Sequence, residues 1–141
     1  MKKLNRRQAR EVAVQFLYQI EMNKEDFASN FAMLKEENPE VDLDDEYLCE
    51  ILEETYKQKE EIDSLVDKNI DAWKMSRIAK VESNIIRLAM YEILNRDDIP
   101  TAVAIDEAVE LAKSFSNQKA ANFVNGVLGK VVDKLELDGK E

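Results

Sequence analysis

The segment SNIIRLAMYEIL, residues 83–94, is apolar at eight of its twelve positions. In an α-helix these apolar side chains would cover nearly the whole circumference. That pattern is typical of a buried helix, whereas a surface helix keeps one polar face. We therefore expect a central helix here, with the other elements packed around it.

Helical periodicity continues on both sides of this segment. Apolar side chains recur at three- and four-residue spacing, which predicts helices over residues 6–21, about 25–36, 101–115 and 119–135. Asn5 is a plausible N-cap of the first of these helices.

A long helical pattern also follows Asp44 or Asp45, either of which could cap it. Its apolar stripe is empty over KQKEE, residues 57–61, before the stripe resumes at Ile62 and runs to Trp73. We interpret this gap as a break or bend between two helices.

The composition favours one all-α domain. A chain of 141 residues can bury a single core, and three glycines and two prolines are too few for the tight turns of a β-sandwich or barrel. Period-two alternation with turn residues is absent, as are internal repeats. We expect residues 1–141 to form a single all-α domain of about seven helices.

Several classes of function are disfavoured by the residues that are missing. Without histidine, the commonest general base and the usual zinc-site spacings are absent. The single cysteine, Cys49, lies among apolar residues, so we expect it to be a buried small side chain rather than a reactive thiol. GVLG at 126–129 falls inside a helical pattern, so its glycines are expected to allow close helix packing and not to bind phosphate.

We therefore expect no enzyme, cofactor or metal, although a paired-carboxylate mechanism stays open as the alternative. Acidic side chains on exposed helical faces usually serve solvation. No apolar run reaches the roughly 20 residues that cross a bilayer, and the N-terminus lacks the apolar core of a signal peptide. The expected location is cytoplasmic, away from membranes.

The charge is divided unevenly along the chain. Residues 1–10 carry five basic side chains and no acidic one, whereas the net charge of the whole chain is −10. The other 131 residues therefore sum to −15, and residues 36–63 alone hold thirteen acids against two lysines. A basic tip precedes an acidic body.

Three arginines of this tip lie at the start of a predicted helix, where negative charge is usually favoured. Arg6, Arg7 and Arg10 fall within an arc of about 100° on the first helix. Positive charge in a first helical turn opposes the helix dipole at a cost of about 0.3–1 kcal/mol per exposed charge. With Lys2 and Lys3 they have the size of a small nucleic-acid footprint. Pairing with the acidic body and a membrane-surface or targeting role remain alternatives.

A second mixture of cations and aromatic rings lies near the C-terminus. Lys113, Phe115, Lys119 and Phe123 fall within eleven residues, a combination that proteins use to contact the backbone and bases of single strands. Packing of both phenylalanines in the core is the alternative.

Four motifs together resemble the NusB family of bacterial transcription antitermination factors. In order along the chain they are RRQAREVAVQFLYQIE at 6–21, RLAMYEIL at 87–94, IPTAVAIDEAVELAKSF at 99–115 and FVNGVL at 123–128. The resemblance runs over essentially the whole chain, and it implies two small helical sub-bundles and no enzymatic activity.

The resemblance also implies partners. Members of the family pair with the small-subunit ribosomal protein called NusE and bind the single-stranded boxA element of nascent ribosomal RNA. With other Nus factors on RNA polymerase, they oppose Rho-dependent termination. The free protein could be a monomer or a homodimer.

Matching the family's motifs residue by residue implies two binding surfaces. The RNA surface comprises Lys2, Lys3, Arg6, Arg7, Arg10, Lys119, Asn122 and Phe123, and the partner surface includes Tyr18 and Glu82. Two positions depart from the family pattern: Gln8 stands where more basic versions have a third arginine, and Asp106 stands where many relatives have asparagine.

Two competing interpretations stay open. NusB-like domains also begin some ribosomal RNA cytosine methyltransferases, in which an α/β cofactor-binding domain would follow, whereas this sequence ends at Glu141. The third interpretation is a helical scaffold whose arginines form only internal ion pairs.

Overall fold

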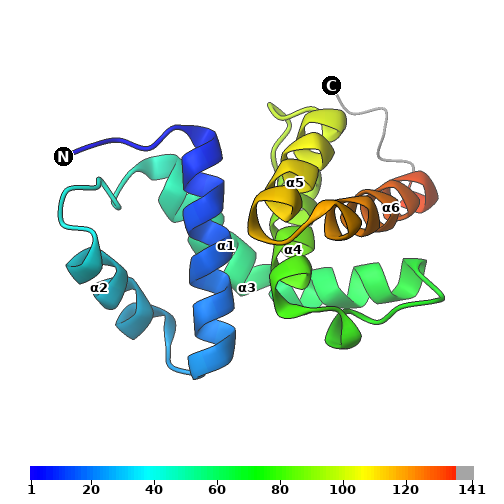
Figure 1. Ribbon diagram of the computed structural model, residues 1–141, viewed down its shortest axis with the longest axis horizontal. Helices are drawn as coiled ribbons and strands as arrows, with labels where there is room; N and C mark the ends of the chain where they lie inside the picture. Colours follow the sequence, from blue (N-terminus) through cyan, green and yellow to red (C-terminus); the bar gives the residue numbers. More distant parts are fainter. Residues whose placement is uncertain (136–141) are drawn as a thin grey trace.

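The computed structural model describes residues 1–135, and these contain six α-helices and no strand (Figure 1). The helices are α1 (Arg6–Asn23), α2 (Phe27–Glu37), α3 (Glu46–Asn69), α4 (Lys80–Asn95), α5 (Thr101–Phe115) and α6 (Gln118–Leu135). A short 3₁₀ helix, Met75–Arg77, lies between α3 and α4. The all-α prediction is confirmed, while the last six residues of the predicted 1–141 domain lie outside the described residues.

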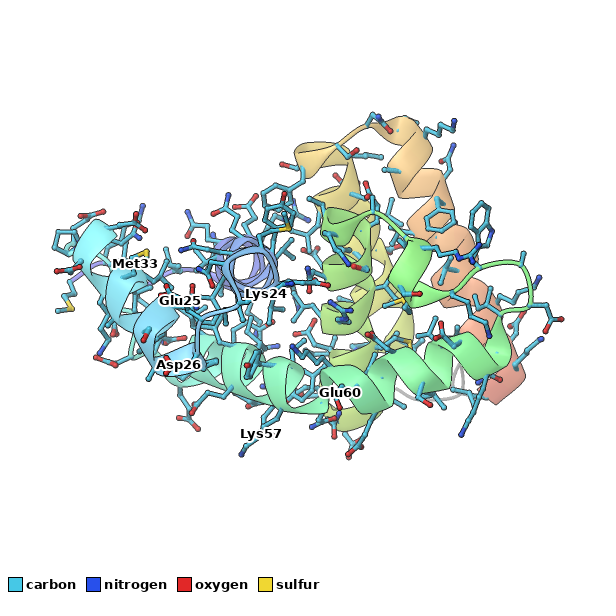
Figure 2. All side chains as sticks on the ribbon, turned by 90° about the horizontal axis from the view of Figure 1, so that it is seen from below. Lys24, Glu25, Asp26, Met33, Lys57 and Glu60 are labelled. Atoms are coloured by element: carbon cyan, nitrogen blue, oxygen red, sulfur yellow. The ribbon has the colours of Figure 1, made fainter. Side chains whose placement is uncertain are left out.

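The helices form two groups that share α3. In the first group α1 packs on α3 and α2 packs on α1, and in the second group α4 and α6 pack on α3 while α5 packs on α4 and α6 (Figure 1). Viewed from below, α3 runs under both groups (Figure 2). Because α1 also packs directly on α4, the two groups are joined by a helix contact as well as by α3. This arrangement agrees with the two sub-bundles that the resemblance implies.

Helix α4 is the centre of the fold, as residues 83–94 predicted. Every residue from Glu82 to Ile93 is buried, because α1, α3, α5 and α6 all pack against this helix. Its buried set includes three polar or charged side chains whose partners come from other helices: Asn84, Arg87 and Glu92. Among the described helices none is both long and apolar enough to cross a bilayer.

The predicted break at residues 57–61 is wrong, because α3 continues through it without interruption. Lys57 and Glu60 lie on the outer face of α3 (Figure 2). The inward positions are filled by Gln58, which accepts a hydrogen bond from Asn95, and by Lys59, whose ammonium lies over the Tyr56 ring. The apolar stripe is empty where α3 crosses from one group to the other, and good helix formers without glycine or proline keep the helix intact there.

The expected place of Trp73 in the apolar stripe is also wrong. Helix α3 ends at Asn69, and Trp73 follows it with 52% of its surface exposed. Ile70, Met75 and Ile78 are buried in this connection instead.

The glycines of GVLG do not allow close helix packing. A Cβ atom placed on Gly126 or Gly129 would have no other atom within 4 Å, and neither glycine has a positive φ. Both positions therefore carry the entropic cost of glycine in a helix without a packing reason.

Replacing either glycine should stabilise the protein. We expect Gly126→Ala and Gly129→Ala each to raise the free energy of unfolding by about 0.5–1 kcal/mol, because alanine restricts the unfolded chain and adds no clash. Urea denaturation followed by circular dichroism measures this change. A loss of stability in either variant would show that the space around that glycine is occupied.

Candidate nucleic-acid interface

The backbone of the basic tip is held in place before α1 begins. Asn5 Oδ1 accepts a hydrogen bond from the Gln8 N–H at 2.8 Å, and Gln8 Oε1 accepts one from the Asn5 N–H at 3.0 Å. The Lys2 N–H donates to the Glu40 carbonyl, and the Lys2 carbonyl accepts from the Asp42 N–H, both at 2.7 Å. Gln8 thus completes a capping box with Asn5.

Arg6 and Arg7 lie at the surface and bind carboxylates from the other half of the chain. Arg6 Nη2 is 3.3 Å from Asp98 Oδ2, and Arg7 makes a bidentate pair with Glu107 at 2.8 and 3.1 Å. The hydrogen bond from Arg7 holds the pKa of Glu107 below its usual value. About half of each arginine side chain stays exposed, 49% for Arg6 and 59% for Arg7. Pairing with the acidic body is therefore present, and both side chains keep a solvent-facing edge.

Arg10 differs from the other two because it is buried. Its guanidinium donates to Glu92 at 2.9 and 3.4 Å and lies 3.5 Å from Glu107. The Tyr47 hydroxyl donates to the same Glu92 carboxylate. Burial acts to lower the pKa of Arg10, but the charge and hydrogen bond of Glu92, together with Tyr47 and Glu107, outweigh burial and raise it. The predicted stripe of three arginines thus has two exposed members and one that joins α1 to α4.

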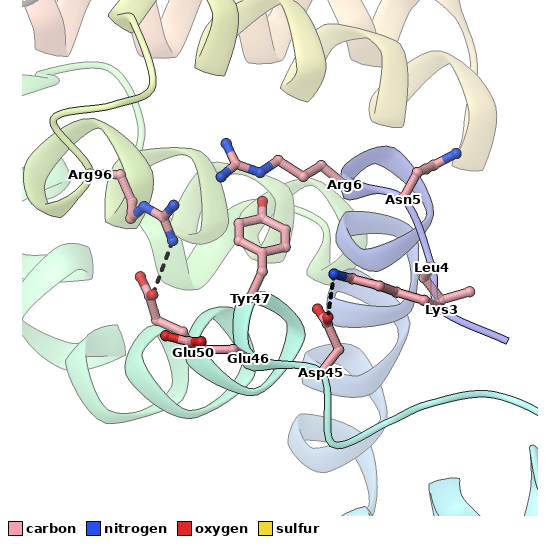
Figure 3. Close-up of a pocket in the computed structure, with 9 residues that line it drawn as sticks. All are labelled: Lys3, Leu4, Asn5, Arg6, Asp45, Glu46, Tyr47, Glu50 and Arg96. Carbon is pink, nitrogen blue, oxygen red and sulfur yellow. Dashed lines mark hydrogen bonds and ion pairs between the residues drawn. The ribbon is translucent and has the colours of Figure 1, made fainter. Parts of the chain in front are cut away.

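The hollow beside Arg6 is balanced in charge. It has a volume of about 490 Å³, and Arg6 and Arg96 reach over the Tyr47 ring from two sides, 4.9 and 5.4 Å from its centroid (Figure 3). Its charged lining comprises Lys3, Arg6, Arg96, Asp45, Glu46 and Glu50. Lys3 lies 3.5 Å from Asp45, and Arg96 lies 3.0 Å from Glu50. Three cations facing three carboxylates give this hollow no net attraction for an anion.

A second cluster of predicted RNA residues lies at the start of α6. Lys119 and Asn122 are exposed, and Asn122 accepts a hydrogen bond from Gln118 at 2.9 Å. Phe123 is half-buried, and its ring meets the Trp73 ring edge-on at 5.6 Å between centroids. Together with Arg77 these aromatic rings line a hollow of about 390 Å³. The sequence interpretation missed Trp73 and Arg77, because no helical pattern marks the connection from which they project.

The two predicted partner residues line neighbouring hollows. Tyr18 is 37% exposed in an apolar groove of about 500 Å³ that also includes Met22, Val81 and Phe115. Glu82 is 9% exposed and lines the hollow of Phe123 instead. The residues predicted for the partner surface and those predicted for the RNA surface therefore meet at the first turn of α4.

Other positions show no reactive site. Within residues 1–135, no group of three histidine, cysteine, aspartate or glutamate side chains could hold a metal ion. The Cys49 thiol donates to the Leu43 carbonyl at 3.3 Å, and burial raises its pKa, which fits a packing role. Asp106 is exposed on α5, where a carboxylate donates no hydrogen bond.

Comparison with known proteins decides the family. The sequence model of the NusB family matches residues 7–133. The chain belongs to the NusB family. Transcription antitermination protein NusB of Acetivibrio thermocellus is 43% identical over 141 residues, which cover 98% of this chain and 97% of that protein. The NusB protein of Clostridium acetobutylicum is 41% identical over 133 residues, covering 94% and 98%. Both relatives are named as transcription antitermination proteins.

Solved NusB structures share the fold over nearly the whole chain. T. maritima NusB matches with a TM-score of 0.81 at 31% identity and covers 94% of each chain. A NusB chain crystallised with NusE and dsRNA matches with a TM-score of 0.80 at 28% identity, covering 92% of this chain and 96% of that one. This NusB-family protein therefore has the fold of a family member that assembles with a protein and an RNA.

Because Arg10 is buried against Glu92, its loss should destabilise the protein strongly. We expect Arg10→Ala to lower the free energy of unfolding by about 3–5 kcal/mol, since the buried Glu92 would lose its cationic partner. Arg7→Ala is the matched control, and its loss should be much smaller because that pair faces solvent. Urea denaturation measures both. Equal losses would contradict the structural role of Arg10.

The Arg7–Glu107 pair should make stability depend on pH. The pKa of Glu107 is lower in the folded state than in the unfolded state, so the unfolded state binds more protons in acid. The contribution of this pair to stability should therefore be constant above about pH 5 and fall as the pH drops below about 4.5, the ordinary glutamate value. The Glu107→Gln variant should lack this loss of stability in acid, because its side chain at position 107 does not titrate. Thermal unfolding of both proteins from pH 7 to pH 3 tests this, and parallel curves would contradict it.

Proposed function

We propose that this protein forms a heterodimer with the small-subunit ribosomal protein NusE and binds the boxA element of nascent ribosomal RNA. The heterodimer would tether that RNA to the elongating RNA polymerase, together with other Nus factors, and oppose Rho-dependent termination. Its place of action would be the cytoplasm. The observation that carries the proposal is the likeness, over nearly the whole chain, to a NusB chain crystallised with NusE and RNA.

The exposed cations support an RNA surface in two parts. The first part is the basic tip, where Lys2, Lys3, Arg6 and Arg7 are exposed. The second is the start of α6, with Lys119, Asn122 and Phe123. A hollow of about 410 Å³ runs from Leu4 and Gln8 to Ser114 and Phe115, and the hollow of Phe123 begins at Ser116. A strand bound at the tip could therefore continue along the α5–α6 junction.

Arg10 receives a different role in this proposal. To contact RNA it would have to break its ion pair with Glu92, which would cost several kcal/mol because both groups are buried. We assign it as a positioning residue, because it also lies 3.5 Å from the Glu107 carboxylate that binds Arg7.

The partner surface is the region of Tyr18 and Glu82. The apolar groove at Tyr18 offers burial for a protein partner, and Met22 beside it is 56% exposed. In the free protein a second copy of the chain could cover the same groove, which would give a homodimer. The acidic body adds attraction for a basic ribosomal protein.

The Arg6→Ala/Arg7→Ala double variant tests the RNA surface without disturbing the buried pair. Fluorescence anisotropy of labelled single-stranded boxA RNA is measured with and without NusE. We expect the double variant to bind more weakly than wild type and to lower the salt slope by roughly 0.7 per lost phosphate contact. Lys57→Ala/Lys130→Ala removes the same charge from exposed positions outside the proposed surface and should bind like wild type.

Three outcomes would count against the proposal. If wild type with NusE binds no RNA, the proposed function is wrong. If the double variant binds as tightly as wild type, the assignment of the basic tip is wrong, and the scaffold interpretation gains support. Equal affinity for boxA and for a scrambled strand would contradict recognition of that element.

A further inference from the structure

Arg77 is exceptional among the arginines of this protein. The chain has six arginines, all within residues 1–135, and five of them form ion pairs with carboxylates. Arg77 is exposed and forms none with any described carboxylate, although acidic residues outnumber basic ones by ten in this chain. An arginine that stays unpaired on an acidic protein has its full hydrogen-bonding capacity available for an external anion.

The connection that carries Arg77 is anchored, so the exposure of its outward side chains is built into the fold. Ile70, Met75 and Ile78 are buried, and the Met75 N–H donates to Asp67 Oδ1 at 2.8 Å. The Trp73 ring contacts Phe123 at one edge, and 52% of the Trp73 surface stays exposed. A large exposed indole on a fixed backbone is typical of a binding surface.

The side chains around Trp73 combine aromatic rings with unpaired cations. The hollow of about 390 Å³ is lined by Trp73, Arg77, Lys119 and Phe123, with Asn117 at its rim. The indole and the Phe123 ring meet at 88°, an edge-to-face contact that keeps the pair rigid. Lys119, like Arg77, forms no ion pair with a described carboxylate. Glu82, 9% exposed, is the one carboxylate in the described lining.

We infer that Trp73 and Arg77 form a nucleotide-binding position for single-stranded RNA, in which a base stacks on the indole and Arg77 binds a phosphate. Aromatic rings beside cations are the means by which proteins bind single strands, because every base has a face that can stack. The inference rests on the proposed RNA-binding function and extends that surface from α6 onto the connection between α3 and α4. Two unpaired cations favour a polyanion over a basic protein partner at this place.

Trp73 is the only tryptophan of the chain, so its emission reports directly on this position. We propose titrating the wild-type protein, with NusE present, with labelled single-stranded boxA RNA while recording anisotropy and tryptophan emission together. Base stacking quenches indole emission, so the quenching should follow the same binding curve as the anisotropy. Trp73→Phe contains no tryptophan and supplies the signal of NusE for subtraction.

Variants test the two contacts separately. We expect Trp73→Ala to weaken RNA binding roughly 5- to 100-fold and Trp73→Phe to retain most of the affinity, because a smaller ring still stacks. Arg77→Gln should lower the salt slope by roughly 0.7, whereas Lys130→Ala, the matched loss of one exposed charge outside the hollow, should not weaken binding. Circular dichroism of each variant checks that the fold is retained.

The outcomes separate this inference from the proposed function. RNA binding seen by anisotropy, with unchanged tryptophan emission and wild-type affinity in Trp73→Ala, would overturn the inference and leave the proposed function standing. No RNA binding by wild type would overturn both. Emission that changes on adding NusE alone, with Trp73→Ala weakening NusE binding and not RNA binding, would assign Trp73 to a protein contact and overturn the inference.

Discussion

Two buried charges of opposite sign on α4 organise the rest of the structure. Glu92, 1% exposed, accepts hydrogen bonds from Arg10 of α1 and Tyr47 of α3. One and a half turns earlier, Arg87 binds Asp63 of α3 at 2.7 Å and Glu21 of α1 at 3.0 Å. A buried ion costs several kcal/mol unless it is paired, so α1 and α3 must each supply a partner at both points. Apolar packing is non-directional. These two charges therefore set the positions of α1 and α3 along α4.

This constraint explains how the basic tip is presented. With Arg10 held by Glu92, Arg6 and Arg7 lie one turn nearer the start of α1, at the surface. Positive charge there opposes the helix dipole, and Asp98 and Glu107 offset part of that cost. Since Glu107 contacts both Arg7 and Arg10, the exposed arginine is oriented through the buried one.

The parts of this fold that could be predicted from the sequence are those set by local pattern. The all-round apolar character of residues 83–94 predicted the buried centre, and Asn5 and Asp45 proved to be helix caps. The periodicity of apolar residues gave a wrong prediction at residues 57–61. A gap in the apolar stripe occurs at a helix end, but it also occurs where one continuous helix passes from one packed group to another, as α3 does here. The burial of Arg10, in contrast to the exposure of Arg6 and Arg7, could not be predicted, because its partner Glu92 is 82 positions away in the sequence. The exposure of Trp73 and Arg77 could not be predicted, because the connection between α3 and α4 lacks the helical periodicity that shows which side chains face outward.

The arginines of this protein fall into two groups: five form ion pairs with carboxylates, and Arg77 is exposed and forms no ion pair with a described carboxylate. The guanidinium groups of these five arginines bind carboxylates of other helices or connections, so most of the hydrogen-bonding capacity of the arginines serves to position the helices. A net charge of −10 repels a polyanion at long range, so attraction for RNA acts at short range, where exposed cations lie close together. A basic protein bound to the acidic body would reduce the long-range repulsion, and this gives a physical reason for the RNA affinity of such a chain to depend on its partner.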